Sequence, residues 1–487
     1  MSLDTHVCII GSGVSGICTA IQVIRQYNTR NFTIIEKSQE LGGTWSVNTY
    51  PGCGCDVPSH FYSFSFALKP DWTQKYAMQP EILAYLKDVS AQYELHKHIR
   101  FGTTTTQTPF SLRSKILVSA VGGLSIPKQC EIPGASTFKG KIFHSAQWDH
   151  SFNWEDRTIV VVGNGCSATQ FVPVISSGQR SAKNVVQFAN QAHWLAERQN
   201  PQYSATFQWM MRWVPLAMRA YRGWLYWNQE KDFRAFDIES GSRYQYADFL
   251  VPKTEIGCKR RVNDTDYLSC LHHENVQLVY DDPIQDITPR GVRTKSGRIV
   301  TADAIILATG FQTQRVLTPM QIYGQRGVSV NDHWQNVSKS IPSAYLGTCL
   351  AGFPNFFIMM GPNTLSGHLS VIYTTECQVN FTMRLIHPIM KNLASAKLKN
   401  SNYENSLSTV GSIMVTPEAE TRDLAETQVK ARRLVWASGC SSWFLDPATG
   451  RNFVMFPDWQ YKFWIRSVWI PWSDFVYRSG SSQLAVE

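Results

Sequence analysis

The sequence predicts an α/β fold with two separate parallel sheets, each organised around a strand, a glycine-rich turn and a helix. An apolar run near the N-terminus is followed by the pattern Gly-x-Gly-x-x-Gly, and a second apolar run, over residues 158–162, is followed by Gly-x-Gly-x-x-Ala. The length agrees, because 487 residues are more than one ordinary domain core holds. We therefore expect two such units in one chain.

The first glycine-rich turn lies between the apolar run 7–10, an expected strand, and the segment 17–24, whose apolar residues repeat at helical spacing. Its three glycines are Gly11, Gly13 and Gly16. They allow the backbone to turn sharply and to approach a pyrophosphate, and the helix N-terminus presents unpaired N–H groups to it. The next expected strand, 32–35, ends in Glu36, which can bind ribose hydroxyls. Together these features predict a dinucleotide site, whereas the turn alone would also fit another α/β protein.

The second turn opens another expected helix after the strand 158–162. The residues of the turn and of the first helical positions are Gly163, Asn164, Gly165, Ser167, Ala168, Thr169 and Gln170. Alanine is allowed at the third fingerprint position because that position mainly governs the packing of helix on strand. The next strand, 184–188, ends without an acid, which disfavours an NAD-type ribose contact. Lys259 or Arg198 would then have to bind a 2′-phosphate.

Two dinucleotide units bring two nucleotides face to face, and electron transfer between them is the simplest reason for that pairing. We therefore predict two Rossmann-like dinucleotide-binding domains.

The segment 196–250 is rich in Trp, Tyr and Met and predicts a helical insertion in the second domain. Residues 463–472 are also rich in Trp; we expect them to pack against the first domain, and contact with a membrane surface is the alternative.

Composition excludes several classes of protein. No apolar run reaches the roughly 20 residues that a membrane span needs, and the strand expected from residue 7 leaves no room for a signal peptide, so we expect a cytoplasmic protein. The net charge is +9, but the longest basic run is 259–261, which suits phosphate-bearing cofactors better than nucleic acid.

The eleven cysteines have no regular spacing, which indicates reduced thiols rather than a disulfide framework. Cys53 and Cys55 are too close together for a reversible disulfide across a helical turn, and without a second close pair they do not predict zinc. We expect no metal site.

The stretch 138–149 between the two units fits FxGxxxHxxxW(P/D), with His144 and Trp148 at fixed positions. It resembles the fingerprint of type I Baeyer–Villiger monooxygenases, whereas the related N- and S-oxygenating flavin monooxygenases carry Tyr or Phe in place of Trp148. Further similar stretches follow along the chain: 41–45, 50–56, 308–311, 361–363 and 440–443. By this resemblance the chain is identified as a member of the family, similar to fungal enzymes of secondary metabolism.

The resemblance implies FAD in the first domain and NADPH in the second, with a small-molecule ketone and O2 as substrates and an ester or lactone as product. It also implies the order of the domains along the chain: 1–140, FAD-binding, first part; 141–195, NADP-binding, first part; 196–250, helical insertion; 251–310, NADP-binding, second part; 311–487, FAD-binding, second part, and C-terminal segment. The sequence leaves the oligomeric state open.

Arg260 resembles the active-site arginine of the family, and Asp56 resembles the acid that orients it. A guanidinium keeps its charge at any working pH, so it can hold an oxygen anion beside the flavin. Arg261 is the adjacent competitor. In the family His144 and Trp148 act through conformation, and Lys259 is expected to face the cofactor phosphate. The flavin-side loop supplies the remaining expected contacts: Gly43, Thr44, Trp45, Cys55 and Tyr62.

The chain departs from the family between residues 100 and 110, which run directly into the strand expected over 111–119: a β-hairpin region of the flavin domain is expected there and too few residues remain for its strands. Gly54 and Asn190 stand where many relatives have arginines that contact the nicotinamide nucleotide. Two alternatives therefore stay open beside ketone oxidation: an N- or S-oxygenating flavin monooxygenase, and a shortened, non-catalytic flavoprotein.

Overall fold

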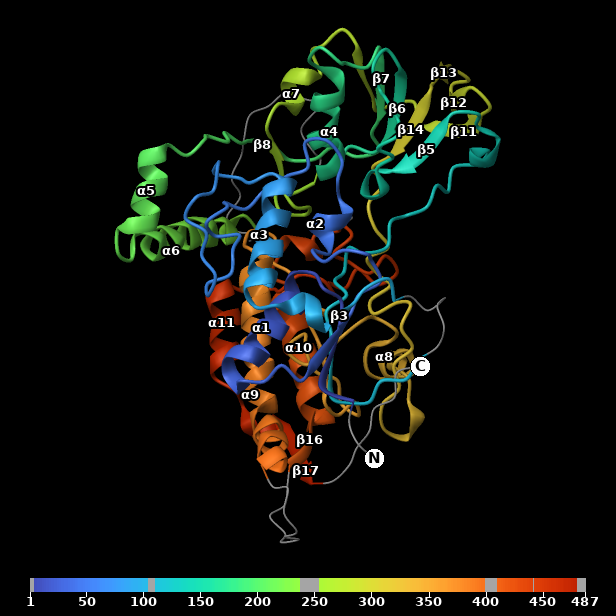
Figure 1. The fold of residues 1–487 in the computed structure, drawn as a ribbon. Coiled ribbons are helices and arrows are strands. Elements are labelled where there is room, and N and C mark those ends of the chain that lie inside the picture. Colours follow the sequence, from blue (N-terminus) through green and yellow to red (C-terminus); the bar gives the residue numbers. More distant parts are fainter. Residues whose placement is uncertain (1–3, 104–109, 237–253, 399–409, 441, 480–487) are drawn as a thin grey trace.

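The computed structural model describes the chain except for residues 1–3, 104–109, 237–253, 399–409, 441 and 480–487. Two parallel sheets form the centres of two neighbouring units, and two helices project from one side of the molecule (Figure 1). Ser441, much of the interval after Arg100 and the end of the expected insertion lie outside the described residues.

The first sheet has five strands, and all neighbours pair in parallel. In spatial order they are β15 (Phe356–Ile358), β4 (Ser114–Ser119), β1 (Thr5–Ile10), β2 (Phe32–Ile35) and β3 (Ile99–Arg100). Alternate residues of β1 enter two different cores: Ile9 packs in the cluster that includes α1 (Val14–Tyr27) and α9 (Val371–Leu398), and Cys8 packs in the cluster that includes α8 (Val330–Ser338). Because both faces are covered, these strands are nearly continuous apolar runs.

The second sheet also has five parallel strands. In spatial order they are β10 (Val276–Val279), β7 (Asn184–Phe188), β6 (Thr158–Val162), β14 (Ala304–Leu307) and β5 (Lys141–His144). The helices α4 (Cys166–Ser176) and α7 (Tyr267–Cys270) lie beside it. A separate antiparallel sheet packs nearby: β11 (Ile284–Thr288), β12 (Gly291–Thr294) and β13 (Ile299–Thr301).

The other described elements surround these sheets. They are α2 (Thr44–Val47), α3 (Gln79–Gln92), β8 (Leu195–Glu197), α5 (Ala205–Trp213), α6 (Ala217–Glu230), β9 (Val262–Asp264), β16 (Val410–Val415), α10 (Pro417–Ala431), α11 (Gln460–Val468) and β17 (Phe475–Ser479). Within the described ranges no helix is long and apolar enough to cross a membrane.

The strands and helices expected around both glycine-rich turns are confirmed, and so is the two-sheet α/β fold. Between β3 and β4 the described residues contain no strand, so the first sheet passes from its edge strand back to its centre through a short connection.

The expectation that all cysteines are reduced thiols is wrong for one pair. Cys258 and Cys440 form a disulfide, with their Cα atoms 5.6 Å apart, and the other nine cysteines are free. The two partners are 182 residues apart in the sequence, so no local spacing reveals the bond. It ties the segment before Arg260 to the C-terminal part of the chain.

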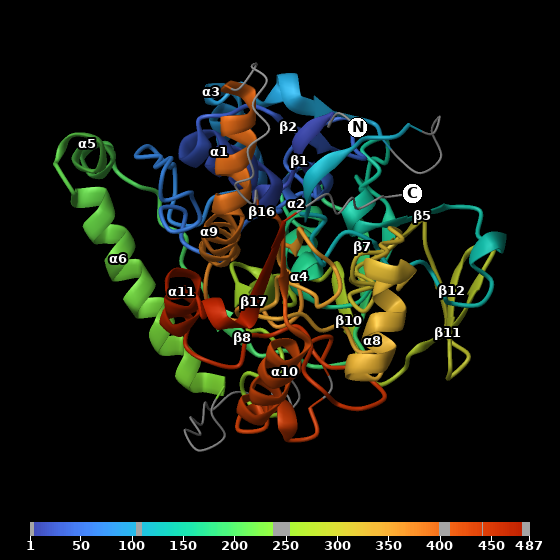
Figure 2. The ribbon, with the colours of Figure 1, turned by 90° about the horizontal axis from the view of Figure 1, so that it is seen from below.

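The helices α5 and α6 form an arm that leans on the first unit (Figure 2). The ring of His60 lies among those of Tyr203, Phe207 and Tyr221, with centroids 5.0–5.6 Å apart. Arg222 of α6 donates hydrogen bonds to the backbone oxygens of His60 and Ser63. Burial lowers the pKa of His60 to about 4, and the charge of Arg222 adds to that effect.

We predict that the pH dependence of stability contains a resolvable contribution from His60. Its folded pKa lies below the ordinary value for histidine, so the contribution is present above about pH 6.5 and is lost as the pH falls towards about 4. Between about pH 7 and pH 5 the wild type should lose about 2 kcal/mol more free energy of unfolding than His60→Phe. Urea unfolding at the two pH values measures this difference, with the exposed His272→Gln as control. Equal losses in wild type and His60→Phe would contradict it.

Candidate active site

The first glycine-rich turn and the loop before α2 form one narrow cradle. A Cβ atom on Gly43 would lie 2.8 Å from the Cα of Gly13, and one on Gly11 would lie 2.6 Å from the backbone oxygen of Ala120. Gly11 and Gly43 also have positive φ, at 104° and 56°. A side chain at Gly43 would fill the space against Gly13 beside the N-terminus of α1, so Gly43 keeps a backbone-lined surface open for a pyrophosphate. Gly11 is required by the close approach of the chain after β4.

Glu36 closes one side of this cradle at the end of β2. Its carboxylate accepts hydrogen bonds from the backbone N–H and the hydroxyl of Ser12, at 2.7 and 2.8 Å, and from the N–H of Ser38 at 2.8 Å. The side chain is buried and fixed against the turn. It therefore lies at the carboxyl edge of the sheet, the position from which an acid binds a ribose in this type of fold.

Trp45 and Tyr62 lie on the other side of the cradle. The indole Nε1 of Trp45 donates to the hydroxyl of Tyr62 at 3.0 Å, and both rings are buried. Gln79 at the start of α3 donates to the backbone oxygen of Trp45. Thr44 begins α2 directly after Gly43. The flavin-side residues named from the sequence are thus brought together by α2, α3 and the loop that follows.

The second turn leaves open space where the first is crowded. A Cβ atom on Gly165 would contact nothing within 4 Å, whereas one on Gly163, at a φ of 108°, would lie 2.6 Å from the backbone oxygen of Ala308. Gly163 is therefore required by the close approach of β14, and Gly165 leaves room above the N-terminus of α4. Ala168 is fully buried, in agreement with a packing role.

Lys259 lies at the end of β7, beside this second turn. Its Nζ contacts the side-chain oxygen of Gln191, and the side chain of Asn164 donates to the backbone oxygen of Gln191 at 2.8 Å. Burial lowers the pKa of Lys259. Gln191 was not singled out from the sequence as a site residue, because only the fold brings it against Lys259, 68 positions away.

Gln170 does not point into the second turn but joins the two units. Its Nε2 donates to the backbone oxygen of Gly54 at 3.1 Å, and its Oε1 accepts from the hydroxyl of Tyr50 at 2.9 Å. Thr169 bonds back within its own helix, to the backbone oxygen of Cys166. The sequence named both as cofactor contacts, and the structure shows Gln170 fixing α4 against the flavin-side loop.

His144 and Trp148 hold the connection between the units. His144 Nδ1 accepts from the backbone N–H of Ala146 at 3.0 Å, so the proton is on Nε2, which lies 3.1 Å from the backbone oxygen of Gly310. Burial lowers the pKa of His144, and the bond to Gly310 partly opposes that effect. Trp148 is buried against Phe143 and Phe171. A neutral His144 thereby links the strand that enters the second unit to the segment that leaves it.

Asp56 and Arg260 meet between the two cradles. Arg260 Nη2 donates to Asp56 Oδ1 at 2.8 Å, and the Arg260 side chain is 30% exposed. Burial is the largest single effect and disfavours the charge of the guanidinium, but Asp56, with smaller contributions from Cys166, Cys55 and Tyr62, opposes it, and the pKa of Arg260 is raised. Arg261 points elsewhere and contacts Asp232 at 3.4 Å. The geometry therefore separates the two adjacent arginines, which the sequence alone did not.

The surroundings of Arg260 include groups from both units. Cys166, at the start of α4, is an exposed free thiol on which the charges of Asp56 and Arg260 both act. Tyr62, on the flavin side, interacts with the same arginine. Arg260 therefore lies beside groups from both units, at a partly exposed position.

Arg198 is a second cation near this pair. It donates to the backbone oxygen of Cys55 at 2.9 Å, and its guanidinium lies 4.2 Å from the ring centroid of Tyr76. The sequence offered Arg198 as a reader of the 2′-phosphate, whereas the structure directs it to the flavin-side loop. Of the two cations named for the 2′-phosphate, only Lys259 therefore lies beside Gln191 at the end of β7.

The free thiols of the flavin-side loop are unsuited to redox chemistry. Cys53 and Cys55 are both buried and unbonded, and burial raises the pKa of both, to about 11 for Cys53. A thiol with a raised pKa supplies little thiolate.

Among the residues that the structure describes, no group of three or more His, Cys, Asp or Glu side chains is arranged to hold a metal ion.

Comparison with known proteins agrees with these two cradles. Residues 9–76 match the NAD(P)-binding Rossmann-like domain family, and residues 120–315 match the flavin-binding monooxygenase-like family. The chain is 33% identical to a Baeyer–Villiger monooxygenase of Pseudomonas aeruginosa, over 94% of this chain and 88% of that protein. It belongs to the Baeyer–Villiger monooxygenase family. The chain is also 32% identical to the FAD-binding monooxygenase ktnD of Aspergillus niger, over 98% of this chain and 83% of that protein.

Solved structures share the fold of this Baeyer–Villiger monooxygenase. OTEMO in complex with FAD and NADP gives a TM-score of 0.80 at 23% identity, over 98% of this chain and 100% of that chain. The closed form of cyclohexanone monooxygenase gives 0.79 at 22% identity, over 99% and 100%. The relatives show the family, so the chain is a flavin-dependent monooxygenase, and the identification made from the sequence is confirmed. FAD and NADP are the two cofactors in the OTEMO complex.

The residues present fit both cofactors. The cradle beside α1 is lined by backbone that a side chain at Gly43 would obstruct, as a pyrophosphate site requires. Glu36 supplies the carboxylate for a ribose. At the second turn, the open space over Gly165 and the cation of Lys259 suit a nucleotide that carries an additional phosphate.

We predict that Gly43→Ala lowers the flavin content of the purified protein. The added Cβ would meet Gly13 in the cradle and would also be strained at a positive φ. The ratio of flavin absorbance to protein absorbance measures the effect. Gly178→Ala is the matched control, because Gly178 also has a positive φ but has no neighbour within 4 Å of a Cβ atom. Full flavin content in Gly43→Ala would show that the cradle is elsewhere.

Proposed function

We propose that this enzyme inserts one oxygen atom beside the carbonyl of a ketone and releases an ester or lactone. The observation that carries the proposal is the ion pair between Arg260 and Asp56, placed between the two nucleotide cradles. A narrower proposal is that the ketone is a secondary metabolite, such as one derived from a polyketide. The similarity to FAD-binding monooxygenases of Aspergillus species supports it.

Bound FAD, once reduced by NADPH, supplies the electrons that activate O2. The part of Arg260 is to hold the negative charge that ketone oxidation places on oxygen, because a fixed cation in a partly enclosed site stabilises such charge strongly. Asp56 orients the guanidinium through its 2.8 Å contact and raises the pKa of Arg260, so the charge persists. Gly11, Gly13, Gly16 and Gly43 would bind the FAD pyrophosphate, Glu36 a ribose, and Thr44, Trp45, Cys55 and Tyr62 the flavin side.

A partly closed hollow lies at the carboxyl edge of the first sheet, and its apolar lining supports the proposal that the substrate is an apolar ketone. Val121 follows β4, Met359 follows β15, and both lie in its lining with Leu317, Phe453 and Trp443. Ligands of such folds bind outside the carboxyl ends of the strands. Trp443 comes three residues after Cys440, whose disulfide partner Cys258 precedes Arg260 by two residues. The disulfide therefore joins the segment that carries Trp443 to the segment that carries Arg260.

We propose further that Lys259 gives the enzyme a preference for NADPH over NADH. It contacts Gln191 at the end of β7, where a ribose 2′-phosphate binds in this type of fold. Asn164 fixes the backbone of Gln191. A compact cation on a flexible stem suits this contact.

Two other functions were open from the sequence. An N- or S-oxygenating monooxygenase does not need the Arg260–Asp56 pair, so that pair disfavours it. A non-catalytic flavoprotein is favoured by one observation, the short connection between β3 and β4. A purified protein that carries bound flavin and oxidises NADPH would exclude this last alternative.

We propose the domain boundaries given above, and the strands of the two sheets support them. The strands of the first sheet come from 5–119 and 356–358, and those of the second come from 141–188 and 276–307.

We also propose a cytoplasmic location, which the nine free cysteines support. Microscopy of the tagged full chain tests it.

We predict that Arg260→Ala abolishes ketone oxygenation but leaves reduction of the flavin by NADPH intact. Loss of a charged group that stabilises developing negative charge should lower ester formation by about 100-fold or more. The test mixes enzyme, NADPH, O2 and a panel of ketones, and follows NADPH oxidation together with the mass gain of one oxygen. Arg261→Ala, which removes the outward-facing neighbour, should keep ester formation. Unchanged product in Arg260→Ala would refute the role of this arginine.

We predict that Lys259→Ala raises KM for NADPH by about tenfold, since a charged hydrogen bond to phosphate is lost. KM for NADH should change little, because NADH has no 2′-phosphate. Steady-state NADPH and NADH oxidation measure both values. Equal increases for the two nucleotides would place Lys259 elsewhere on the cofactor.

A further inference from the structure

The second unit holds two consecutive residues of the flavin-side loop through two arginines. The Nη1 of Arg198 donates to the backbone oxygen of Cys55 at 2.9 Å. The next residue, Asp56, accepts from the Nη2 of Arg260 on its carboxylate at 2.8 Å. Arg198 therefore binds the loop one peptide bond away from the acid that contacts Arg260.

A two-stranded parallel ribbon carries both arginines. The strands β8 and β9 pair with Ala196 opposite Asn263. Arg198 directly follows β8, and its backbone N–H donates to the backbone oxygen of Asp264 at 2.7 Å. Arg260 lies two residues before β9. The ribbon therefore fixes the spacing of the two arginines along the backbone, and both side chains extend from it to the same loop.

The ring of Tyr76 supports the side chain of Arg198. The guanidinium lies 4.2 Å from the ring centroid, within the range of a cation–π contact. Asn200 fixes Tyr76 in turn: its Oδ1 accepts from the backbone N–H of Tyr76 at 2.9 Å, and its Nδ2 donates to the backbone oxygen at 3.0 Å. The backbone N–H of Lys75 donates to the oxygen of Pro201 at 3.0 Å. The chain after Arg198 thus runs along the segment that carries Tyr76, which limits the freedom of the guanidinium.

The contacts of Arg198 are those of a group that holds backbone in place. In the part of the chain that the structure describes, the guanidinium contacts a backbone oxygen and a ring rather than a carboxylate, and its Nε is buried without a hydrogen-bond partner. Burial lowers the pKa of Arg198, and among the groups that oppose this effect Asp56 is the first. A desolvated cation with so few partners contributes little to stability by itself, so its place beside Asp56 calls for another role.

The hydrogen bond to Cys55 fixes the peptide group that leads to Asp56. A peptide group is planar, so its oxygen, its nitrogen and both Cα atoms turn together. A donor on the oxygen of Cys55 therefore fixes the direction in which the side chain of Asp56 leaves the backbone. On the following peptide, the Nδ2 of Asn263 lies 3.4 Å from the backbone oxygen of Asp56. The ribbon thus contacts both peptides that flank this acid.

We propose that Arg198 is a positioning residue for oxygen insertion: through the peptide between Cys55 and Asp56 it fixes the carboxylate of Asp56, and thereby the guanidinium of Arg260. The inference rests on the proposed role of Arg260. A misplacement of about 1 Å in a group that acts on the reacting atoms can lower a rate by about 100-fold. Loss of the hydrogen bond from Arg198 should therefore be visible in ester formation.

The test uses the full-length enzyme with bound flavin, NADPH, O2 and the ketone of the panel that gives the most product. Arg198→Gln should lower kcat for ester formation by about tenfold, because the carboxylate of Asp56 is no longer held in place. KM for NADPH and the rate at which NADPH reduces the flavin should stay unchanged. Arg198→Lys keeps a charged donor, so it should recover the rate to within about threefold of the wild type.

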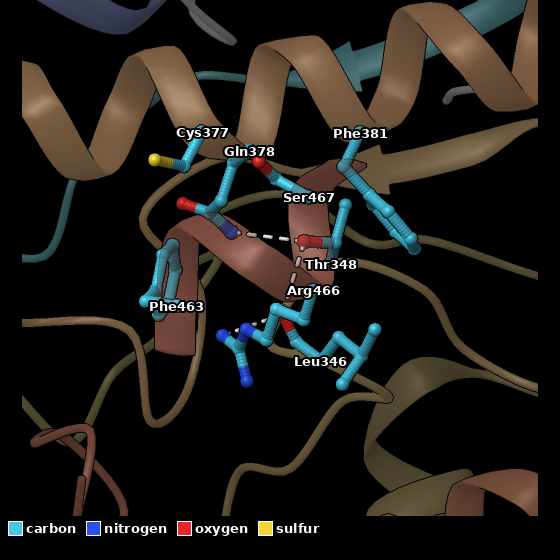
Figure 3. Close-up of a pocket in the computed structure, with 8 residues that line it drawn as sticks. All are labelled: Leu346, Thr348, Cys377, Gln378, Phe381, Phe463, Arg466 and Ser467. Atoms are coloured by element: carbon cyan, nitrogen blue, oxygen red, sulfur yellow. Dashed lines mark hydrogen bonds between the residues drawn. The ribbon is translucent and has the colours of Figure 1, made fainter. Parts of the chain in front are cut away.

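Arg466→Gln is the matched control, because Arg466 on α11 makes the same kinds of contact with residues that belong to neither cradle. Its guanidinium lies 3.9 Å from the ring centroid of Phe463 and donates to the backbone oxygen of Leu346 at 3.2 Å (Figure 3). This variant should keep the kcat of the wild type. Rates are compared per bound flavin, and thermal unfolding shows that each variant is folded; Arg466→Lys replaces the control if it is not.

A double-mutant cycle shows whether Arg198 acts through Asp56. In the Asp56→Asn background, Arg198→Gln should lower ester formation by less than about twofold, since the carboxylate that Arg198 positions is already absent. If Arg198→Gln does not fold, Arg198→Lys takes its place in the cycle.

Three results would overturn the part of Arg198: a wild-type kcat in Arg198→Gln, the same loss in the Asp56→Asn background as in the wild type, or an equal loss in Arg466→Gln. Arg260→Ala in the same assay separates this inference from the proposed function. Unchanged ester formation in Arg260→Ala refutes the role of Arg260 and the positioning role with it. A collapse in Arg260→Ala beside a wild-type rate in Arg198→Gln overturns the positioning role alone.

Discussion

The contact between Arg260 and Asp56 joins the two halves of the site. Asp56 belongs to the flavin-side loop and Arg260 to the chain that returns through the second unit, 204 residues later. Neither charge is fully exposed, so each needs the other to remain partly buried without a large cost of desolvation. The placement of the guanidinium therefore depends on how closely the two units approach, and the contacts that set this approach are part of the catalytic arrangement.

Three contacts determine how closely the two units approach each other, and each lies in a different part of the chain. Gln170 joins α4 to Gly54, two residues before Asp56. His144 joins the strand that enters the second unit to Gly310, where the chain leaves it. The disulfide of Cys258 ties the segment before Arg260 to the C-terminal part of the chain. The neutral ring of His144 thereby fixes both connections between the units.

Local signals in the sequence were sufficient for the fold, because glycine-rich turns between apolar runs such as 7–10 and 158–162 have few alternative structures. The resemblance to the family supplied Arg260 and Asp56. Contacts across long sequence separations could not be predicted, as the disulfide and the pairing of Lys259 with Gln191 show. The aromatic arm was also ambiguous, because composition does not tell which side of a helix is covered. The burial of Leu225 and the exposure of Trp224 show which side of α6 is covered.

The short connection between β3 and β4 has a limited effect on the cradle. The groups that form the described cradle come from the turn after β1, from Glu36 after β2, and from the loop around Trp45 that α3 supports. Of the described residues between β3 and β4, Thr103 donates to the backbone oxygen of Glu36 at 2.9 Å and Gly102 donates to that of Ser38 at 3.0 Å, so the start of the connection still supports the end of β2. In the parallel sheet β3 still pairs with β2, and β4 pairs directly with β1, so the order of the strands does not depend on additional chain at this edge. The shortening therefore removes material beside the sheet while the backbone that faces the pyrophosphate keeps its support.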